Sequence, residues 1–398
     1  MTAVEKRLTI DHALVHIIFQ AMAGIVYGFT VYLLMARGFN SAIAGFSMSF
    51  ANLGSLFIQP MVANFLDKTK KYTVFDICVY ISIIMVLLYV ASCLITNATV
   101  LLFVIYTLSI AAYSSLEPLF NSLSSVFINS GINIEFGRAR ALGSVSYGLI
   151  CFIFGLLTEN YTYTVVLIGG CIFAILICLI SLIIRKDYNK ADKTIKEKED
   201  VNIIGFGEFI KENKTYIILC ICLAGIFFGY TICDNFTILI VENVGGSSKD
   251  MGAVLCIKAV LEGIFIFFYS NVRKHIKLNT LLTVSMIGFI LKNFVTWKAE
   301  SVMTIYIVQI LQIFSFAIIL PAMVEYVNTN MDEYVAIRGH AFFTLTIVIG
   351  STFSGTIGGI VSDKFGISTT MFIGLIATII SAIGFISTLG AQKIKHKN

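Results

Sequence analysis

Twelve runs of predominantly apolar residues, each about 20 residues long, follow one another along the sequence with short polar connections between most of them. A helix of that length crosses the ~30 Å hydrocarbon core of a bilayer. Lipid offers backbone groups no hydrogen-bond partner, and the runs lack the two-residue alternation of barrel strands, so an all-helical membrane protein is expected. The predicted spans are 12–35, 42–66, 73–95, 99–121, 141–158, 162–184, 215–241, 251–270, 279–297, 301–326, 341–361 and 367–390.

The composition also indicates a chain that lies in lipid. Only 13% of the 398 residues are charged and 58% are hydrophobic, and the mean hydropathy is +0.90. A soluble domain carries about 25% charged residues, and half that proportion cannot cover the surface that a 43.9 kDa globule presents to water. These values exclude a soluble enzyme, a nucleic-acid-binding domain and a disordered chain, and they make the lipid bilayer the expected surroundings.

Basic residues are distributed unevenly between the two ends of the predicted spans. If the N-terminus lies in the cytoplasm, 22 of the 28 Lys and Arg residues fall in inner segments and four fall in outer loops. Loops rich in Lys and Arg stay in the cytoplasm. We therefore expect a multi-pass protein of the cell membrane with both termini cytoplasmic. The net charge of +5 reflects this asymmetry rather than nucleic-acid binding.

One long polar stretch, residues 185–214, divides the chain into halves of similar length. The predicted domains are an N-terminal six-helix bundle (1–186), a cytoplasmic central loop (187–214) and a C-terminal six-helix bundle (215–398). Two six-helix bundles joined by a charged loop is the plan of the major facilitator transporters. The fold expected is therefore the major facilitator fold, with twelve transmembrane helices.

The connection after the second span carries a short motif. Ala63 stands four residues before Asp67, and Lys68, Lys70 and Lys71 follow. This pattern resembles the inner-loop signature of the major facilitator superfamily, in which a small residue precedes an aspartate by four positions and basic residues follow. An aspartate can cap a neighbouring helix N-terminus, and basic residues keep the loop inside. Asp67 and Lys68 are the candidate residues of this signature.

The most specific string runs from Asn133 to Arg140 (NIEFGRAR), just before the fifth predicted span. It resembles the segment that opens the fifth helix of the lactose-permease-like family of oligosaccharide:proton symporters. The resemblance implies that Arg140 binds a sugar, because a guanidinium presents a planar fork of donors to neighbouring hydroxyls. It also implies a stacking aromatic residue seven positions later, where this chain has Tyr147. The alternative is that Arg140 is a positive-inside anchor and Tyr147 a packing residue.

The acidic partner that the family provides for this arginine is absent at the matching positions. Alignment without gaps places it at Ser122, or at Asn121 if Pro118 is matched to the family's proline. Glu117 lies one helical turn from Asn121 and could take its place. The candidate solute-binding residues of the N-terminal half are Arg140, Tyr147, Glu117, Asn121 and Ser122.

The C-terminal half keeps only part of the family's ionisable set. The resemblance places the family's ninth-helix arginine at Lys292, and its tenth-helix lysine, histidine and proton-carrying glutamate at Gln309, Gln312 and Ser315. The last three cannot carry a proton. Asp234 matches a family aspartate, but the lysine that would balance it there has become Gln309. Gln309 and Gln312 are counted with the candidate coupling site.

Lys258 and Glu262 lie four residues apart inside the eighth predicted span, so they share one helix face and can meet directly. Each charge costs about 2.5–3.5 kcal/mol at a helix centre on insertion scales, and such residues mark functional pathways by default. We predict that they join Asp234 and Lys292 in a relocated charge network in which Glu262 takes the coupling proton. A structural bridge that locks the helices is the alternative.

The cysteines and histidines form no recognisable metal or redox motif. All nine cysteines lie in apolar runs, and Cys220 and Cys222 have the wrong spacing for a zinc or redox site, so packing is expected. His12 and His16 stand one turn apart at the start of the first span and are expected at the membrane interface. No metal site and no cofactor is predicted.

The sequence therefore predicts a secondary transporter that moves a small polar solute by alternating access. A sugar or glycoside carried with protons is the first hypothesis. Another solute, such as a nucleoside, an organic acid or an exported compound, is the second. A non-transporting membrane sensor or a membrane enzyme is the third, although no enzyme or ATP-binding motif supports it. The transporter is expected to work as a monomer.

Overall fold

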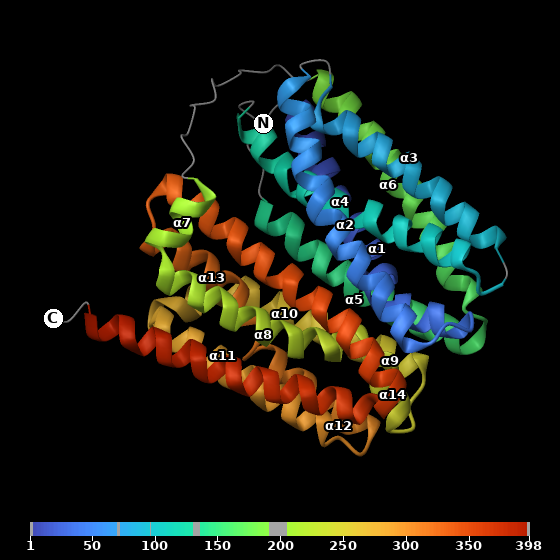
Figure 1. The fold of residues 1–398 in the computed structure, drawn as a ribbon. Helices are drawn as coiled ribbons and strands as arrows, with labels where there is room; N and C mark the ends of the chain where they lie inside the picture. Colours follow the sequence, from blue (N-terminus) through green and yellow to red (C-terminus); the bar gives the residue numbers. More distant parts are fainter. Residues whose placement is uncertain (1–2, 70–71, 96, 130–135, 191–204, 396–398) are drawn as a thin grey trace. The chain divides into compact units, whose positions relative to one another are not determined.

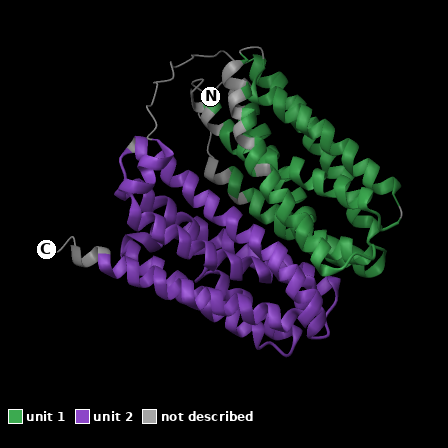
Figure 2. Cartoon of the chain, viewed as in Figure 1, with its two compact units in different colours: residues 1–198 green, residues 199–398 purple. Residues whose placement is uncertain are grey.

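The structure is a computed structural model, and all the regular structure in the residues that it describes is helical (Figure 1). The described residues are 3–69, 72–95, 97–129, 136–190 and 205–395. The chain divides into two compact units, unit 1 (residues 1–198) and unit 2 (residues 199–398) (Figure 2). The division falls inside the stretch that the sequence assigns to the central loop.

Unit 1 has six long helices in its described residues, one for each predicted span. They are α1 (Ala3–Ala36), α2 (Ser41–Lys68), α3 (Val74–Leu94), α4 (Val100–Asn129), α5 (Phe136–Asn160) and α6 (Thr164–Lys190). Helix α1 packs against α5 and α6, while α3 packs against α4 and α6. Helix α6 continues to Lys190, four residues beyond the predicted end of the N-terminal bundle at residue 186.

Polar residues in the short connections determine where several of these helices begin. The side chain of Asn40 accepts a hydrogen bond from the backbone nitrogen of Ile43, 3.0 Å away, at the start of α2. Thr73 and Asp76 form a reciprocal capping box at the start of α3. These caps satisfy backbone N–H groups that have no partner within the helix.

Unit 2 contains more helical segments than predicted spans. They are α7 (Phe206–Glu212), α8 (Lys214–Asn235), α9 (Thr237–Asn243), α10 (Ser248–His275), α11 (Leu278–Trp297), α12 (Val302–Val308), the 3₁₀ segment η1 (Gln309–Gln312), α13 (Phe316–Asn330) and α14 (Glu333–Lys395). The short helix α7 lies where a loop is predicted, because its Phe209 is fully buried and stacks on Phe342. Helix α8 packs against α14 and α11, and α10 packs against α13 and η1.

Two predicted spans of unit 2 are interrupted, and two others are merged. The seventh span is divided between α8 and α9 at Phe236, and the tenth is divided by η1, with Ser315 outside helical geometry (φ −118°, ψ −97°). Helix α14 holds the eleventh and twelfth spans, which meet at Gly366 (φ 81°, ψ 164°). Only glycine adopts such a positive φ without strain, so it marks the turn between the two spans.

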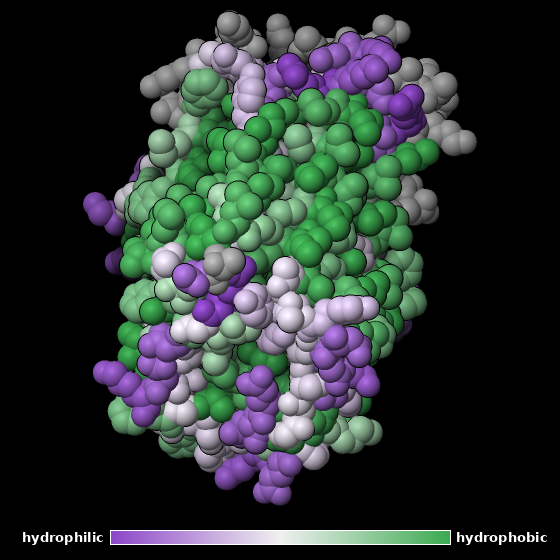
Figure 3. Space-filling model, turned by 90° about the vertical axis from the view of Figure 1, so that its right-hand side faces the viewer, coloured by the Kyte–Doolittle hydropathy of each residue, from purple (hydrophilic) through white to green (hydrophobic). Residues whose placement is uncertain are grey.

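Apolar side chains fill the units and also cover the surface over the spans. In unit 2, Phe227, Phe289 and Ile319 are fully buried in one hydrophobic core. At the surface of unit 1, aliphatic side chains such as Leu87 and Ile172 are more than half exposed. Figure 3 shows hydrophobic residues over a broad area of one face, bordered by hydrophilic ones. Such surface is expected where lipid tails replace water.

Candidate functional site

The structure gathers the candidate residues in two polar clusters, one in each unit. In unit 1, Arg140 lies in the second turn of α5, half-buried. Its Nη1 is buried and has no hydrogen-bond partner among the described residues. Buried guanidinium donors are normally satisfied, because leaving one unpaired costs free energy. Within the part of the chain that the structure describes, Arg140 therefore has an unused donor in α5 just before the membrane-spanning part of that helix.

Glu117 shares the surroundings of Arg140. Both side chains interact electrostatically with Tyr113, which lies one turn before Glu117 on α4 and is almost completely buried. Among the described residues no ion pair within 4.0 Å joins the two. The predicted partnership is thus an arrangement in one cluster rather than a direct salt bridge.

The two other α4 candidates, Asn121 and Ser122, are half-buried. The hydroxyl of Ser122 donates to the carbonyl oxygen of Leu119, 2.7 Å away on the same helix. Serine commonly makes such local bonds in transmembrane helices. The hydroxyl donor of Ser122 is therefore used within α4.

Tyr147 lies two helical turns after Arg140 on α5 and is half-buried. Helix α5 runs directly against α1 here, because the Ser146 hydroxyl donates to the carbonyl oxygen of Ile17 at 2.7 Å. Arg140 also interacts electrostatically with His16 on α1. The unit 1 cluster thus includes α1 as well as α4 and α5.

The two histidines that are expected at the membrane interface are enclosed by other side chains of unit 1. His12 and His16 are 0% and 1% exposed, and their rings meet edge to face at 4.8 Å. His12 also packs against Phe127 of α4, with ring centroids 5.9 Å apart. Both rings are therefore interior groups of unit 1. Their i, i+4 spacing on one helix face was the signal that sequence reasoning underused.

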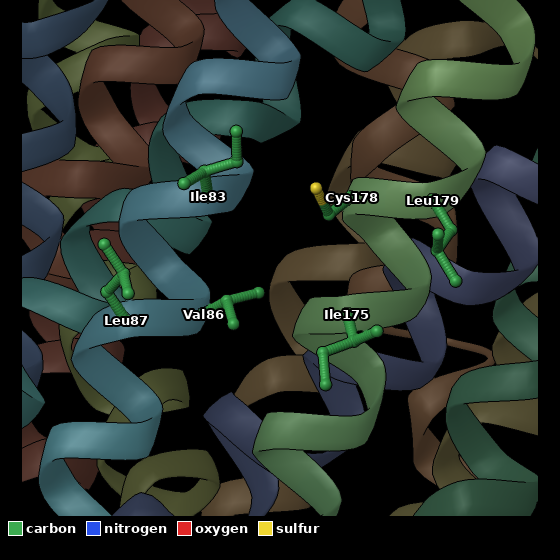
Figure 4. A pocket seen from close by; sticks show the side chains of 6 residues that line it. All are labelled: Ile83, Val86, Leu87, Ile175, Cys178 and Leu179. Atoms are coloured by element: carbon green, nitrogen blue, oxygen red, sulfur yellow. The ribbon is translucent and has the colours of Figure 1, made fainter.

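A separate apolar pocket of about 170 Å³ lies between α3 and α6 (Figure 4). Figure 4 shows six side chains around it, from Ile83, Val86, Leu87, Ile175, Cys178 and Leu179. None of these provides a charged group or a strong hydrogen-bonding group for a polar solute. The polar solute of a transporter would have no recognition partner there.

In unit 2 a charge pair joins two helices. Lys258 Nζ on α10 lies 2.8 Å from Asp234 Oδ2 at the end of α8. The Lys258 side chain is 9% exposed and that of Asp234 is 26% exposed. The ion pair of Lys258 is therefore made to another helix, whereas its spacing from Glu262 suggested a partner within α10.

Gln312 connects the remaining charges. Its Nε2 donates to Glu262 Oε2 and to the Tyr230 hydroxyl, each 3.1 Å away. Its Oε1 accepts a hydrogen bond from Lys292 Nζ. The Lys292 ammonium also lies 5.0 Å from the centre of the Tyr230 ring, a cation–π distance. Asp234, Lys258, Glu262 and Lys292 are thus brought together around Tyr230 and Gln312.

Gln309 and Ser315 have local partners instead. Gln309 Nε2 donates to the carbonyl oxygen of Ile305, 3.0 Å away, and among the described residues this is its one side-chain hydrogen bond. The Ser315 hydroxyl donates to the carbonyl oxygen of Leu311 at 2.8 Å. Neither contact reaches a charged group. Asp67 and Lys68, the predicted inner-loop signature, have side chains that lie outside the described part of the chain.

Tyr230 is a central residue that is not among the candidates selected from the sequence. It is 3% exposed and stacks on Phe316, the first residue of α13, with ring centroids 4.8 Å apart. Its hydroxyl accepts a hydrogen bond from Gln312, whereas its ring contacts Lys292 and Phe316. The signal available was its position one turn before Asp234, which places both on one helix face.

Comparisons with known proteins agree with this architecture. The sequence profile of the MFS_1 like family matches residues 10–387. A curated relative, the uncharacterized transporter YwbF of Bacillus subtilis (strain 168), is 26% identical over 380 residues, which are 92% of this chain and 90% of YwbF.

Solved structures with the same fold are also transporters. The nucleoside transporter NupG gives a TM-score of 0.79 at 15% identity, over 96% of this chain and 98% of NupG. The POT family transporter PepTSo gives a TM-score of 0.76 at 11% identity, over 98% of this chain and 99% of PepTSo. The predicted major facilitator fold is confirmed. The chain belongs to the MFS_1 like family and is a divergent, multi-pass membrane transporter of the major facilitator superfamily.

Proposed function

We propose that this transporter moves a sugar or glycoside together with protons by alternating access. The observation that carries the proposal is the network of four ionisable side chains in the spans of unit 2. Charges inside a membrane are costly, and in transporters they mark ion pathways and proton relays. In the symporters that this chain resembles, a glutamate of the tenth helix carries the proton. This chain has Ser315 at that position, so another residue must take the proton.

Glu262 is the carboxylate best suited to take the coupling proton. Asp234 is paired with Lys258 at 2.8 Å, so protonation of Asp234 would break that ion pair. Glu262 accepts a hydrogen bond from the neutral amide of Gln312. Its charge can therefore change while the Asp234–Lys258 pair stays intact.

Arg140 is the residue that we assign to the solute. A sugar hydroxyl can use the Nη1 donor, which no described residue satisfies, and the planar guanidinium can serve two neighbouring hydroxyls. Tyr147, two turns along the same helix, offers an aromatic face to the apolar side of a sugar ring. Glu117, Asn121 and Ser122 are assigned to the same solute site.

A nucleoside is the second candidate solute. It shares a polar sugar with the first candidate, and the fold similarity to NupG favours testing it. We further propose that the protein lies in the cell membrane with both termini cytoplasmic, following its basic residues, and that it works as a monomer.

Uptake into proteoliposomes tests the proposal. A panel of radiolabelled sugars, glycosides and nucleosides is presented with and without an inward proton gradient. We expect one sugar or glycoside to accumulate saturably and to require the gradient. Accumulation of nucleosides alone would mean that the solute is a nucleoside and not a sugar or glycoside. Uptake that does not depend on the proton gradient would refute proton coupling.

Glu262→Gln separates coupling from transport as such. We expect this variant to lose gradient-driven accumulation but to retain solute exchange between two equal pools, because exchange requires no net proton movement. Asp250→Asn serves as the control, since Asp250 forms a capping box at the start of the same helix. Full gradient dependence in Glu262→Gln would assign the proton to another group.

A further inference from the structure

Gln312 lies between a carboxylate and an ammonium group, with no exposed surface of its own. Its NH2 group donates to Glu262 Oε2, and its carbonyl oxygen accepts from Lys292 Nζ. An amide carries donors at one end and acceptors at the other, whereas an ammonium group has donors only. The orientation of Gln312 is thus the one that matches an accepting Glu262 and a donating Lys292.

Protonation of Glu262 changes the hydrogen-bonding group that faces the Gln312 amide. A protonated carboxyl group gains an O–H donor, and the acceptor of the adjacent side chain is Gln312 Oε1. If the amide turns to accept this proton, its NH2 group faces the ammonium of Lys292. Two donors then oppose each other, and Lys292 loses the hydrogen bond that holds it.

We propose that Gln312 is a positioning residue that holds Lys292 while Glu262 is ionised and releases it when Glu262 takes a proton. The proposal rests on the assignment of Glu262 as the proton acceptor. Once released, the Lys292 ammonium offers its donors to a hydroxyl, carbonyl or carboxylate oxygen of the solute. Proton binding and solute binding are then linked through one neutral side chain.

The backbone around Gln312 is built as a break in the tenth span. The 3₁₀ segment η1 ends at Gln312, and α13 begins four residues later at Phe316. Helix α11 supports the break: the Ser285 hydroxyl donates to the carbonyl oxygen of Ser315 at 3.0 Å. Short 3₁₀ stretches inside a helix often mark hinges, and broken helices form ion and substrate sites in transporters. The break therefore places Gln312 where a change of side-chain orientation can be passed to α13.

Other titratable groups also face this part of unit 2. They are Tyr230, Cys233 and Asp234 on α8, Lys258 on α10 itself, and Lys292 on α11. On the other elements packed against α10, Tyr306 of α12 is hydrogen-bonded to Asp250, and Glu325 of α13 is paired with Arg273. Glu242 is the acidic residue of α9. Asp250 and Arg273 are each about three helical turns from Glu262 along α10.

We call this link from Glu262 through Gln312 to Lys292 the relay. Difference infrared spectroscopy between two pH values tests the relay with protons as the probe. Purified protein labelled with ¹³C in its glutamine side chains is compared on either side of the Glu262 titration, which is identified by its loss in Glu262→Gln. We expect a labelled amide carbonyl band to shift in the same pH step. It should be lost in Gln312→Met and retained in Gln309→Met, a matched control whose hydrogen bond stays within its own segment.

The result distinguishes the relay from the proposed function. A Glu262 titration without any glutamine band in the wild-type protein would overturn the relay, and this measurement does not depend on whether Gln312→Met folds. A band that survives in Gln312→Met would also overturn it. The uptake panel alone decides which solute is carried and whether protons drive it, so failure there leaves a separate signature.

Discussion

Lys258 Nζ lies 2.8 Å from Asp234 Oδ2, and this ion pair links α10 to α8 across 24 positions of sequence. Both residues lie in membrane-spanning helices, where an unpaired charge is costly. The pair therefore stabilises the packing of unit 2 and supplies each charge with its counter-ion.

Removal of one member of this pair should cost more than removal of both. We expect Lys258→Met to lower the free energy of unfolding by about 1–3 kcal/mol, because a partly buried carboxylate is left uncompensated. The double variant Lys258→Met, Asp234→Asn should regain at least half of that loss. Unfolding of the wild-type protein, the single variants and the double variant in detergent measures this coupling. Lys249→Met is the exposed control on the same helix. A double variant no more stable than Lys258→Met would contradict the coupling.

Arg140→Lys should weaken solute binding, since an ammonium group cannot present the planar fork of donors. We expect the KM for exchange to rise about tenfold, equivalent to about 1.4 kcal/mol, while folding stays intact. Arg37→Lys is the matched control, because Arg37 hydrogen-bonds to the carbonyl oxygen of Ile95 and packs over the Tyr163 ring. An unchanged KM in Arg140→Lys would return Arg140 to an anchoring role.

Gly288→Ala should destabilise unit 2 at the break in the tenth span. A Cβ at Gly288 would lie 2.1 Å from the carbonyl oxygen of Phe314, closer than any real contact. We expect a loss of about 1–3 kcal/mol, as for overpacking in a core, measured by thermal unfolding. Gly390→Ala is the control, because nothing lies within 4 Å of its added Cβ. A neutral Gly288→Ala would mean that α11 and the break can separate freely.

Cys93 and Cys171 should form a disulfide under mild oxidation. Their Sγ atoms lie 3.5 Å apart, on α3 and α6, and a disulfide needs about 2.05 Å. With a diazene oxidant, the two thiols lose two protons and two electrons, and the diazene becomes a hydrazine. Mass spectrometry of the digested protein should detect the linked peptides, while Cys222 and Cys256 stay unlinked. Equal labelling of all nine cysteines after oxidation would contradict this contact.

The sequence allowed the number and order of the spans to be predicted, because the length of an apolar run is a local property. Each predicted span is mostly helical, although two are interrupted, and the capping residues Asn40 and Thr73 mark two of the beginnings. Breaks inside the runs were not predictable in the same way. The hydropathy of residues 309–315 is that of a continuous helix, and only contacts with α11 show where the backbone departs from it.

The candidate site also has a part that could be predicted from the sequence and a part that could not. Asp234, Lys258, Glu262 and Lys292 could be selected from sequence alone, because each is a charge inside an apolar run. Their pairing could not, since Lys258 has Glu262 as a neighbour on its own helix and Asp234 as a partner on another. Tyr230 and Gln312 carry no charge, so Gln312 was selected only through the family resemblance and Tyr230 was not selected. Their importance comes from the groups around them.

By itself the sequence determined that this chain lies in lipid, spans it with helices and carries a few costly charges within them. These properties depend on the solvent preference of each side chain and on residues close in sequence. Only the tertiary structure decided that Lys258 pairs with Asp234, that both histidines are buried, and that Gln312 lies between Glu262 and Lys292. Those contacts depend on distances between helices, which side-chain packing sets and local sequence does not encode.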